Sequence, residues 1–464
     1  MMRDKQSNDV YPNTITYKNN YMKILQWNFS FFLKKCNCAL LKSLTVTFLF
    51  VFFLFGQSLK AQPIDILLKG GHVIDPKNNI DTKMDIAITG DKISKVAVDI
   101  PSKEAKKVVD VSGLYVTPGI IDMHVHVFWG TDPDSYIADG HTSVPPDAFS
   151  FRAGVTTMVD AGSSGWRDFP LFKAQTIDRS KTRVLAWLNV VGTGMYSRYK
   201  EQDVRDMNPV MIAYMINRLY PDIIVGIKSA HFWGDFSSVD SAVKAGKLAD
   251  VPVMVDFGEH YPPNSIEDLF MKHLRPGDVF THTFSSIGNN SRRGRESVVD
   301  DVTGIVKPFI FKAQKRGIIF DVGHGGGAFS WSQAVPSYQQ GFYPNTISTD
   351  LHTESMNGGM KDMANVMSKF LALGMSVQDV ISRSTLAPAN VIHRPDLGNL
   401  SVGSVADVAV FNLEKGNFGF LDVRGKKVLG KEKLVAELTI RAGKIVWDLN
   451  GIGAALYVKP DTYK

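Results

Sequence analysis

The chain has 464 residues, of which 44% are hydrophobic and 21% are charged, which is enough apolar material for a large buried core. Its formal net charge of +6 arises entirely within residues 1–62, because the rest of the chain holds as many acidic as basic side chains. A charge-balanced body gives no reason to expect binding to nucleic acid.

Residues 1–62 have the pattern of an export leader. A basic region that ends at Lys42 precedes an uncharged run at residues 44–55, and small or polar residues then lead to Ala61. The run is too short for an ordinary membrane span, so we expect a signal peptide cleaved near Ala61 and a periplasmic or secreted protein without a stable span after processing. An uncleaved anchor is the alternative. Both cysteines lie in this leader, so the exported body would have neither a disulfide nor a cysteine–metal site.

Short strand-like segments separated by glycines occupy residues 63–113, and the same pattern occurs in residues 397–464. Turns are expected at residues 90–91 and 441–444. Neither piece is long enough to form a good sheet core alone. We therefore expect one small composite β-sandwich domain, built from both ends of the chain, with residues 114–396 held between them.

Residues 114–396 contain apolar, strand-like runs separated by segments of crossover length. The runs span residues 116–123, 155–159, 184–191, 223–227, 251–255, 279–284, 318–322 and 346–349. Continuous apolar runs are typical of parallel strands buried on both faces, and this number of units indicates an α/β fold of the (β/α)8 TIM barrel type. Residues 214–219 and 363–373 are expected to be amphipathic helices. An open doubly wound sheet is the alternative, but no Gly-x-Gly-x-x-Gly turn follows the first run.

Nearly every run ends in a residue that can bind a metal or transfer a proton. The residues at these ends are His124, His126, Asp160, Asn189, Lys228, Asp256, His282, His324 and Asp350. In a barrel such strand ends meet at one face, where the chemistry takes place. His124 and His126 are two residues apart, so in a strand both imidazoles point to the same face and can hold one ion.

The residues around the histidine pair carry a recognisable motif. Pro118, Gly119 and Asp122 complete the pattern Pro-Gly-x-Ile-Asp-x-His-x-His, and with it the chain resembles the amidohydrolase superfamily. The resemblance implies a barrel with a composite sandwich and two divalent metal ions, zinc first, with manganese, iron or cobalt as alternatives. The metal ligands that it implies are His124, His126, Lys228, His282 and Asp350. It also implies that Lys228 is carboxylated and bridges the two ions, and that Asp350 is the catalytic group that transfers the proton during attack by a metal-bound hydroxide.

The fifth run departs from the family pattern, which has a histidine at this strand end. The sequence has Asp256 there, and His260 follows four residues later. Three interpretations are open. Asp256 could replace the imidazole as a charged ligand, His260 could reach back from the loop, or the second metal site could be weakened or lost. We expect Asp256 to be the ligand, because the end of the strand fixes its position.

Substrate binding is expected at the glycine-rich turn formed by His324, Gly325 and Gly326. Backbone N–H groups beside an imidazole suit a carboxylate or an oxyanion, although a plain strand-to-helix turn is the alternative. This segment is most similar to the deacetylase branch of the superfamily, whose members are often labelled dihydroorotase-like. Dihydroorotases themselves carry a substrate-gripping arginine where this chain has Phe128.

We therefore expect a metal-dependent amidohydrolase or deacetylase that cleaves an amide, or an ester, of a small acylated acid. The alternatives are a dihydroorotase-like cyclic amidase and a non-catalytic binding protein on a degraded barrel. The expected partner is a small-molecule substrate. The sequence allows a homo-oligomer but does not specify the oligomeric state.

Overall fold

The computed structural model describes residues 64–129, 131–132, 135–136, 142–256, 264–286 and 296–457. The leader at residues 1–62, with its expected cleavage point, and the loop residue His260 lie outside the described residues, so the expectations about them stay predictions. Within the described ranges, no helix has both the length and the apolar character that crossing a membrane requires.

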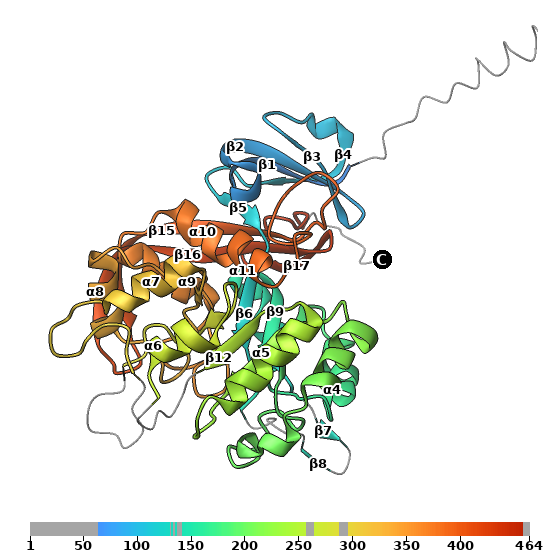
Figure 1. Cartoon of the computed structure of the whole chain (residues 1–464). Helices are drawn as coiled ribbons and strands as arrows, with labels where there is room; N and C mark the ends of the chain where they lie inside the picture. Colours follow the sequence, from blue (N-terminus) through green and yellow to red (C-terminus); the bar gives the residue numbers. More distant parts are fainter. Residues whose placement is uncertain are drawn as a thin grey trace, which may run out of the picture. The chain divides into compact units, whose positions relative to one another are not determined.

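One eight-stranded sheet joins the two ends of the chain, as the blue and red strands of Figure 1 show. Its N-terminal strands are β1 (Ile64–Asp75), β2 (Ile80–Thr89), β3 (Lys92–Ala97), β4 (Ala105–Asp110) and β5 (Tyr115–Pro118). Its C-terminal strands are β15 (Val408–Leu421), β16 (Lys427–Arg441) and β17 (Lys444–Asp448). The order is β17-β16-β15-β5-β1-β2-β3, with β4 beside β1, so the antiparallel pair β5–β15 connects the two ends. A two-layered sandwich stays a prediction.

The expected turns of this sheet lie between hydrogen-bonded strands. Residues 90–91 connect the antiparallel strands β2 and β3. Ala442 and Gly443 connect β16 to β17 with φ values of 47° and 75°. Two consecutive left-handed residues match the right-handed twist of the flanking strands, which is why this short connection can hold a hairpin.

The second large sheet contains seven parallel strands in the order β14-β13-β12-β11-β10-β9-β6. These strands are β6 (Ile120–Val125), β9 (Val155–Ala161), β10 (Arg183–Asn189), β11 (Ile224–Ala230), β12 (Val253–Asp256), β13 (Val279–Phe280) and β14 (Ile319–Phe320). Each strand pairs with its neighbour along the chain, and each coincides with one of the predicted apolar runs. A separate short pair, β7 (Thr131–Asp132) and β8 (Ser135–Tyr136), lies in the loop after β6.

The eighth run closes the sheet into a barrel without forming a regular strand. On one side the Gly325 N–H donates to the Thr349 carbonyl at 2.8 Å. On the other side the Asp350 N–H donates to the His124 carbonyl at 2.7 Å, at the end of β6. Because residues 346–351 are bonded to both edges, the sheet is closed, and the open doubly wound alternative is wrong.

The first predicted run, residues 116–123, is split between the two sheets. β5 ends at Pro118 in the eight-stranded sheet, and β6 begins at Ile120 in the barrel. A Cβ atom at Gly119 would lie only 2.2 Å from Oγ1 of Thr156. The chain therefore passes between the sheets at a residue where only glycine fits.

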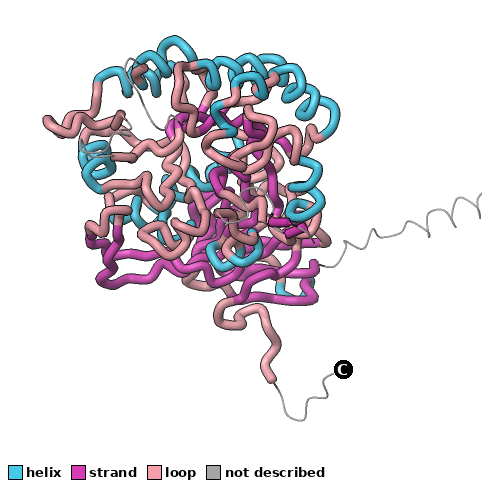
Figure 2. Tube along the Cα trace, turned by 90° about the horizontal axis from the view of Figure 1, so that it is seen from below, coloured by secondary structure: helices cyan, strands magenta, loops and turns pink. Residues whose placement is uncertain are grey.

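Helices lie outside the barrel strands, as Figure 2 shows in cyan around the magenta strands. They are α3 (Phe169–Phe172), α4 (Pro209–Tyr214), α5 (Ser237–Ala249), α6 (Ile266–Asp268), α7 (Pro308–Arg316), α8 (Trp331–Gln339), α9 (Met363–Ala372), α10 (Val377–Ser384) and α11 (Leu386–Val391). Both predicted helical segments are present, since α4 continues as a π-helical turn at Met215–Leu219 and α9 covers the second. α9 begins where the Asp362 carboxylate accepts the Asn365 N–H.

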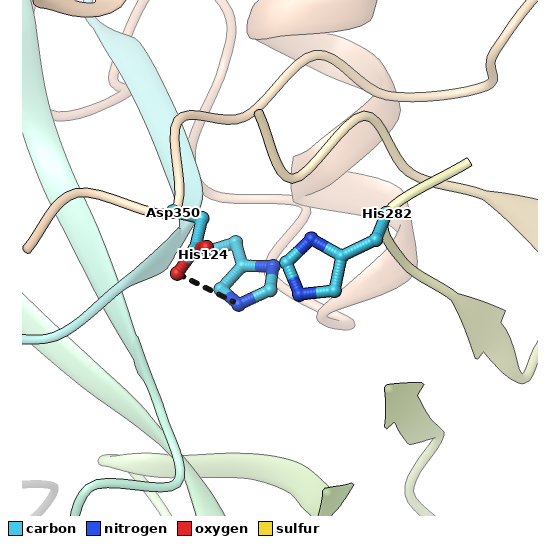
Figure 3. Close-up of side chains that lie close together, drawn as sticks. All are labelled: His124, His282 and Asp350. Atoms are coloured by element: carbon cyan, nitrogen blue, oxygen red, sulfur yellow. Dashed lines mark ion pairs between the residues drawn. The ribbon is translucent and has the colours of Figure 1, made fainter. Parts of the chain in front are cut away.

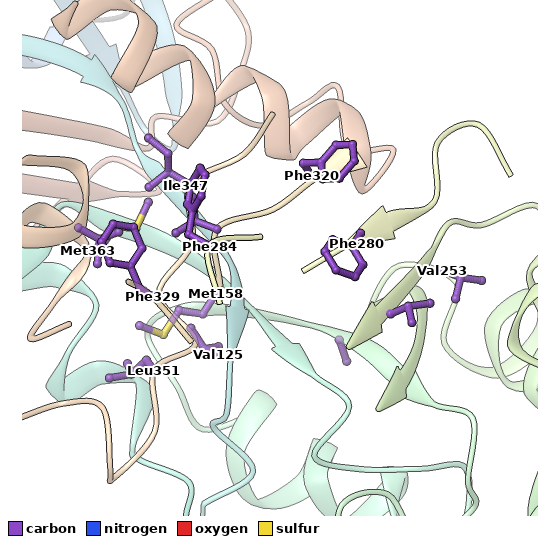
Figure 4. Packing of buried hydrophobic residues seen from close by; sticks show 14 of the residues in the cluster. Val125, Met158, Val253, Phe280, Phe284, Phe320, Phe329, Ile347, Leu351 and Met363 are labelled. Atoms are coloured by element: carbon purple, nitrogen blue, oxygen red, sulfur yellow. The ribbon is translucent and has the colours of Figure 1, made fainter. Parts of the chain in front are cut away.

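Aliphatic and aromatic side chains together fill the large core between strands and helices (Figure 4). Phe280 and Phe320, from neighbouring strands, both pack edge-on against Phe270, with ring centroids 4.9 and 5.4 Å away. A separate cluster contains Trp187, whose indole N–H donates to the Met123 carbonyl at 2.9 Å. These contacts fix the strands whose ends carry the candidate site.

Gly226→Ala is expected to destabilise the protein by about 1–3 kcal/mol, the usual range for overpacking a core. An added Cβ would lie 2.3 Å from the Trp187 ring and 2.8 Å from the Pro252 carbonyl oxygen. The free energy of unfolding in urea measures the effect. Gly358→Ala is the control, because its nearest neighbours would be 3.6 Å away. Equal stability of both variants would contradict the packing described here.

Candidate active site

His124 lies at the end of β6 with its ring held in one tautomer. The Thr281 hydroxyl donates to Oδ2 of Asp321 at 2.8 Å, so it accepts the Nδ1–H of His124, also at 2.8 Å. The lone pair of the neutral ring is then on Nε2. Burial lowers the pKa of His124 to about 3. His124 is therefore a neutral imidazole at pH 7, the form that binds metal ions.

Asp350 follows the eighth run and faces the histidine pair. Its Oδ1 lies 3.2 Å from Nε2 of His126 and 3.5 Å from Nε2 of His124. Burial alone would raise the pKa of Asp350, but the imidazoles around it, with His352 foremost, hold that pKa well below its usual value. A Cβ at Gly325 would approach Oδ2 of Asp350 to 2.4 Å, so the glycine leaves room for a charged carboxylate.

His282, two residues after the end of β13, completes a buried group with His124 and Asp350 (Figure 3). One ligand atom from each of the three residues lies within 4.8 Å of the others. The Nδ1–H of His282 donates to the Gly323 carbonyl at 2.6 Å, so its lone pair is also on Nε2. Two imidazoles and one carboxylate from three different strand ends are thus brought together.

The remaining candidate ligands surround this group. The Nδ1 of His126 lies 3.0 Å from the Ser163 hydroxyl. Lys228 is 1% exposed at the end region of β11, and its Nζ lies 3.3 Å from Nε2 of His124. Asp256 ends β12, and its Oδ2 lies 3.4 Å from Nε2 of His282. The metal-ligand candidates within the described residues are therefore at the same end of the barrel.

His324, in contrast, is engaged within the protein. It is fully buried and stacks on Phe329 with ring centroids 4.5 Å apart. Its Nδ1–H donates to the Gly325 carbonyl at 2.9 Å, and its Nε2 accepts from Nζ of Lys369 at 2.5 Å. Gly325 and Gly326 are beside Asp350 and Glu354 respectively. Binding of substrate by this turn stays a prediction. The His324 side chain stabilises the turn through its hydrogen bonds to Gly325 and Lys369.

Four polar residues near the site were not predicted. His231 follows β11, and its Nε2 lies 3.4 Å from Oδ2 of Asp256, while Glu201 contacts its other nitrogen.

The other two residues are His352 and Lys369. The Nδ1–H of His352 donates to the Asp350 carbonyl at 2.7 Å. Burial opposes a charge on this ring, but the Asp350 charge raises the pKa of His352 to about 9. Burial lowers the pKa of Lys369 to about 7. In the sequence, His231 follows Lys228 by three residues and His352 follows Asp350 by two. Both histidines lie in loops after strand ends, where no periodic pattern predicts the direction of a side chain.

Comparison with known proteins gives consistent relatives, although no family model matches the chain. A deacetylase from Brucella anthropi is 33% identical over 398 residues, which are 80% of this chain and 93% of that protein. A deacetylase from Enterococcus faecalis is 30% identical over 390 residues, covering 82% and 98% of the two chains. The crystal structure of an adenine deaminase superposes with a TM-score of 0.74 at 28% identity, covering 83% of this chain and all of that one, and a dihydroorotase gives 0.68 at 28%, covering 82% and 99%.

The chain has histidines and a carboxylate at the strand ends of a closed parallel barrel, and its relatives are named deacetylase, dihydroorotase and adenine deaminase. The protein is a hydrolytic enzyme that acts on carbon–nitrogen bonds. The chain belongs to the amidohydrolase superfamily. The alternative of a non-catalytic binding protein loses its support.

Proposed function

We propose that the enzyme is a metal-dependent deacetylase that cleaves the amide, or an ester, of a small acylated acid. The observation that carries this proposal is the buried group of His124, His282 and Asp350, whose ligand atoms lie within 4.8 Å of one another. Relatives named deacetylase, similar over four-fifths of the chain, support the choice of reaction.

The donor set fits a divalent metal ion. His124 and His282 each present an Nε2 lone pair, because their Nδ1–H groups are engaged by Thr281 and Gly323. Neutral imidazoles and a charged carboxylate are the ligands that zinc accepts, and manganese, iron and cobalt accept them as well. We propose His124, His126, Lys228, Asp256, His282 and Asp350 as the residues that hold two such ions. When bound, the ions supply a water that ionises near neutral pH and a Lewis acid for the carbonyl oxygen.

Asp350 is placed to move the proton. Its carboxylate is charged, since neighbouring imidazoles keep its pKa well below the usual value. In amide hydrolysis the water oxygen forms a bond to the carbonyl carbon, and the bond between that carbon and the leaving nitrogen breaks. Asp350 can accept the proton from the attacking water and deliver it to the leaving nitrogen. The Nδ1–H of His352 donates to the backbone carbonyl of Asp350 and keeps a positive charge beside the carboxylate.

The environment of Phe128 favours a deacetylase over a dihydroorotase-like cyclic amidase. Phe128 is fully buried and packs on Phe172, with ring centroids 4.8 Å apart. It offers no bidentate donor where a dihydroorotase would hold a substrate carboxylate. The dihydroorotase structure with its TM-score of 0.68 keeps the cyclic amidase as the second candidate.

Metal analysis and a substrate screen test the proposal together. The purified protein should contain divalent metal by mass spectrometry, and hydrolysis should be fastest with N-acetyl amino acids or acetylated hydroxy acids. Chelation should abolish turnover, and added zinc or manganese should restore it. Preferential hydrolysis of cyclic amides would favour the second candidate. A metal-free protein without hydrolytic activity on any of these substrates would overturn the proposal.

Lys228→Ala is expected to lower the occupancy of the second metal position. Burial favours an uncharged amine, which can form an N–C bond to carbon dioxide and release one proton to give an anionic bridge. Protein equilibrated with carbon-13 bicarbonate should then show a carbamate signal by NMR, and the signal should be absent from Lys228→Ala. Short carboxylic acids should restore part of the metal content. The exposed Lys247→Ala is the control, and a carbamate signal that persists without Lys228 would contradict the assignment.

A further inference from the structure

The fifth strand of the barrel supplies a carboxylate, Asp256, rather than an imidazole, and a histidine from another element lies against it. In the register of β11 and β12, Ala230 is opposite Asp256, so the next residue, His231, is beside the carboxylate. Its Nε2 lies 3.4 Å from Oδ2 of Asp256. His282 approaches the same oxygen, also at 3.4 Å. One carboxylate oxygen thus has an imidazole nitrogen on each of two sides.

The orientation of His231 is fixed by a buried acid. The side chain of Glu201 is 2% exposed, and its carboxylate accepts the Nδ1–H of His231 at 3.1 and 3.2 Å. The lone pair of the neutral ring is therefore on Nε2 and faces Asp256. A carboxylate that accepts the outer N–H of an imidazole is the arrangement that commonly orients metal-bound histidines.

The distances indicate ligands around an ion rather than direct hydrogen bonds. Charge-assisted bonds between imidazolium and carboxylate are about 2.7–2.9 Å long. Ligand atoms about 2.0–2.1 Å from a tetrahedral ion are separated by about 3.3–3.4 Å. Both nitrogen–oxygen distances at Asp256 are 3.4 Å, which matches the second spacing.

The backbone of His231 has the same unusual conformation as two of the proposed ligands. His231, His282 and Asp350 have φ values of 52°, 61° and 50°, although none is a glycine. His231 directly follows β11, His282 lies two residues after β13, and Asp350 directly follows the eighth run. Left-handed non-glycine residues are strained, and they cluster at functional sites, where the surrounding structure holds the side chain in a particular direction.

We infer that His231 supplies the imidazole that the fifth strand lacks, and that it binds the second metal ion together with Asp256 and His282, with Glu201 as its positioning residue. This inference rests on the proposed metal-dependent function and adds a ligand from the loop after the fourth strand. It also gives the Asp256 position a nitrogen donor without any contribution from His260.

Cobalt binding to the full-length protein tests the inference without using activity. Titration of the metal-free protein with Co²⁺, monitored by calorimetry and visible absorption, should show two equivalents of bound cobalt per chain. Asparagine tolerates the left-handed backbone, so His231→Asn should stay folded. It should lose one cobalt equivalent, or bind that equivalent with an affinity lowered by about 10- to 100-fold. Asp256→Ala should affect the same equivalent. Glu201→Gln should weaken it by about 10- to 100-fold and leave the other equivalent unchanged.

The matched control is His393→Asn, because His393 is an exposed histidine with a φ of 54°. It should bind cobalt as the unaltered protein does. Unchanged cobalt stoichiometry and affinity in His231→Asn would overturn the inference and leave the proposed function standing. If the unaltered protein takes up no metal, both the inference and the proposed function fail.

Discussion

His124→Ala is expected to remove bound metal and hydrolysis together while the barrel stays folded. The ring is 1% exposed, and its Nε2 lies 3.5 Å from Oδ1 of Asp350 and 3.3 Å from Nζ of Lys228, so alanine removes a ligand atom from within the site. A ligand present at 1,000 times its dissociation constant stabilises a protein by about 4 kcal/mol. Zinc should therefore raise the melting temperature of the unaltered protein and have little effect on the variant.

The control for this experiment is His72→Ala. His72 lies in β1 with its side chain 44% exposed and contacts Asp81. Its loss should change neither metal content nor turnover. Full metal content and activity in His124→Ala, with the control unaffected, would remove the histidine pair from the site.

Asp350→Asn is expected to lower kcat by about 10²- to 10⁴-fold, the usual contribution of a positioned proton-transfer group. Asparagine has nearly the same shape and tolerates the φ of 50° at this position, so the backbone can remain in place. The substitution removes the negative charge that faces His124, His126 and His352. Steady-state kinetics at saturating metal separates this loss from weakened metal binding.

Asp250→Asn provides the matched control, because Asp250 is an exposed aspartate with a φ of 56° at the end of α5. Both variants exchange a left-handed aspartate for asparagine, but only one of them alters the site. A kcat close to that of the unaltered protein in Asp350→Asn would assign the proton transfer to another residue.

The barrel could be predicted because its strands are buried on both faces, which produces continuous apolar runs in the sequence. The residues directly after those runs then identified one end of the barrel as the candidate site. The run at residues 116–123 was misleading, because hydrophobicity does not reveal that the chain changes sheets at Gly119. That change depends on the close approach of Thr156, a contact that only the folded chain contains.

Other residues of the site could not be predicted, because their roles depend on contacts across the fold. His231 and His352 lie in loops, where no periodic pattern identifies a direction for the side chain. The helix at residues 363–373 was predicted to be amphipathic, which is wrong, because residues 363–370 of α9 are all buried. Lys369 is among them, and its Nζ donates to the Gly359 and Leu421 carbonyls as well as to His324. The acceptors come from distant segments, so a charged residue in this helix gave no sign of burial.

The pairing of β5 with β15 has a consequence for the order of folding. The Thr117 hydroxyl lies 3.3 Å from the Ala409 carbonyl, and these residues are 292 positions apart in the chain. During synthesis the N-terminal strands leave the ribosome long before their partner strand exists, at about 5–20 residues per second. For that time β5 presents an unpaired edge, which is a template for association with other chains. We therefore expect this protein to depend on chaperones until synthesis of its last strands is complete.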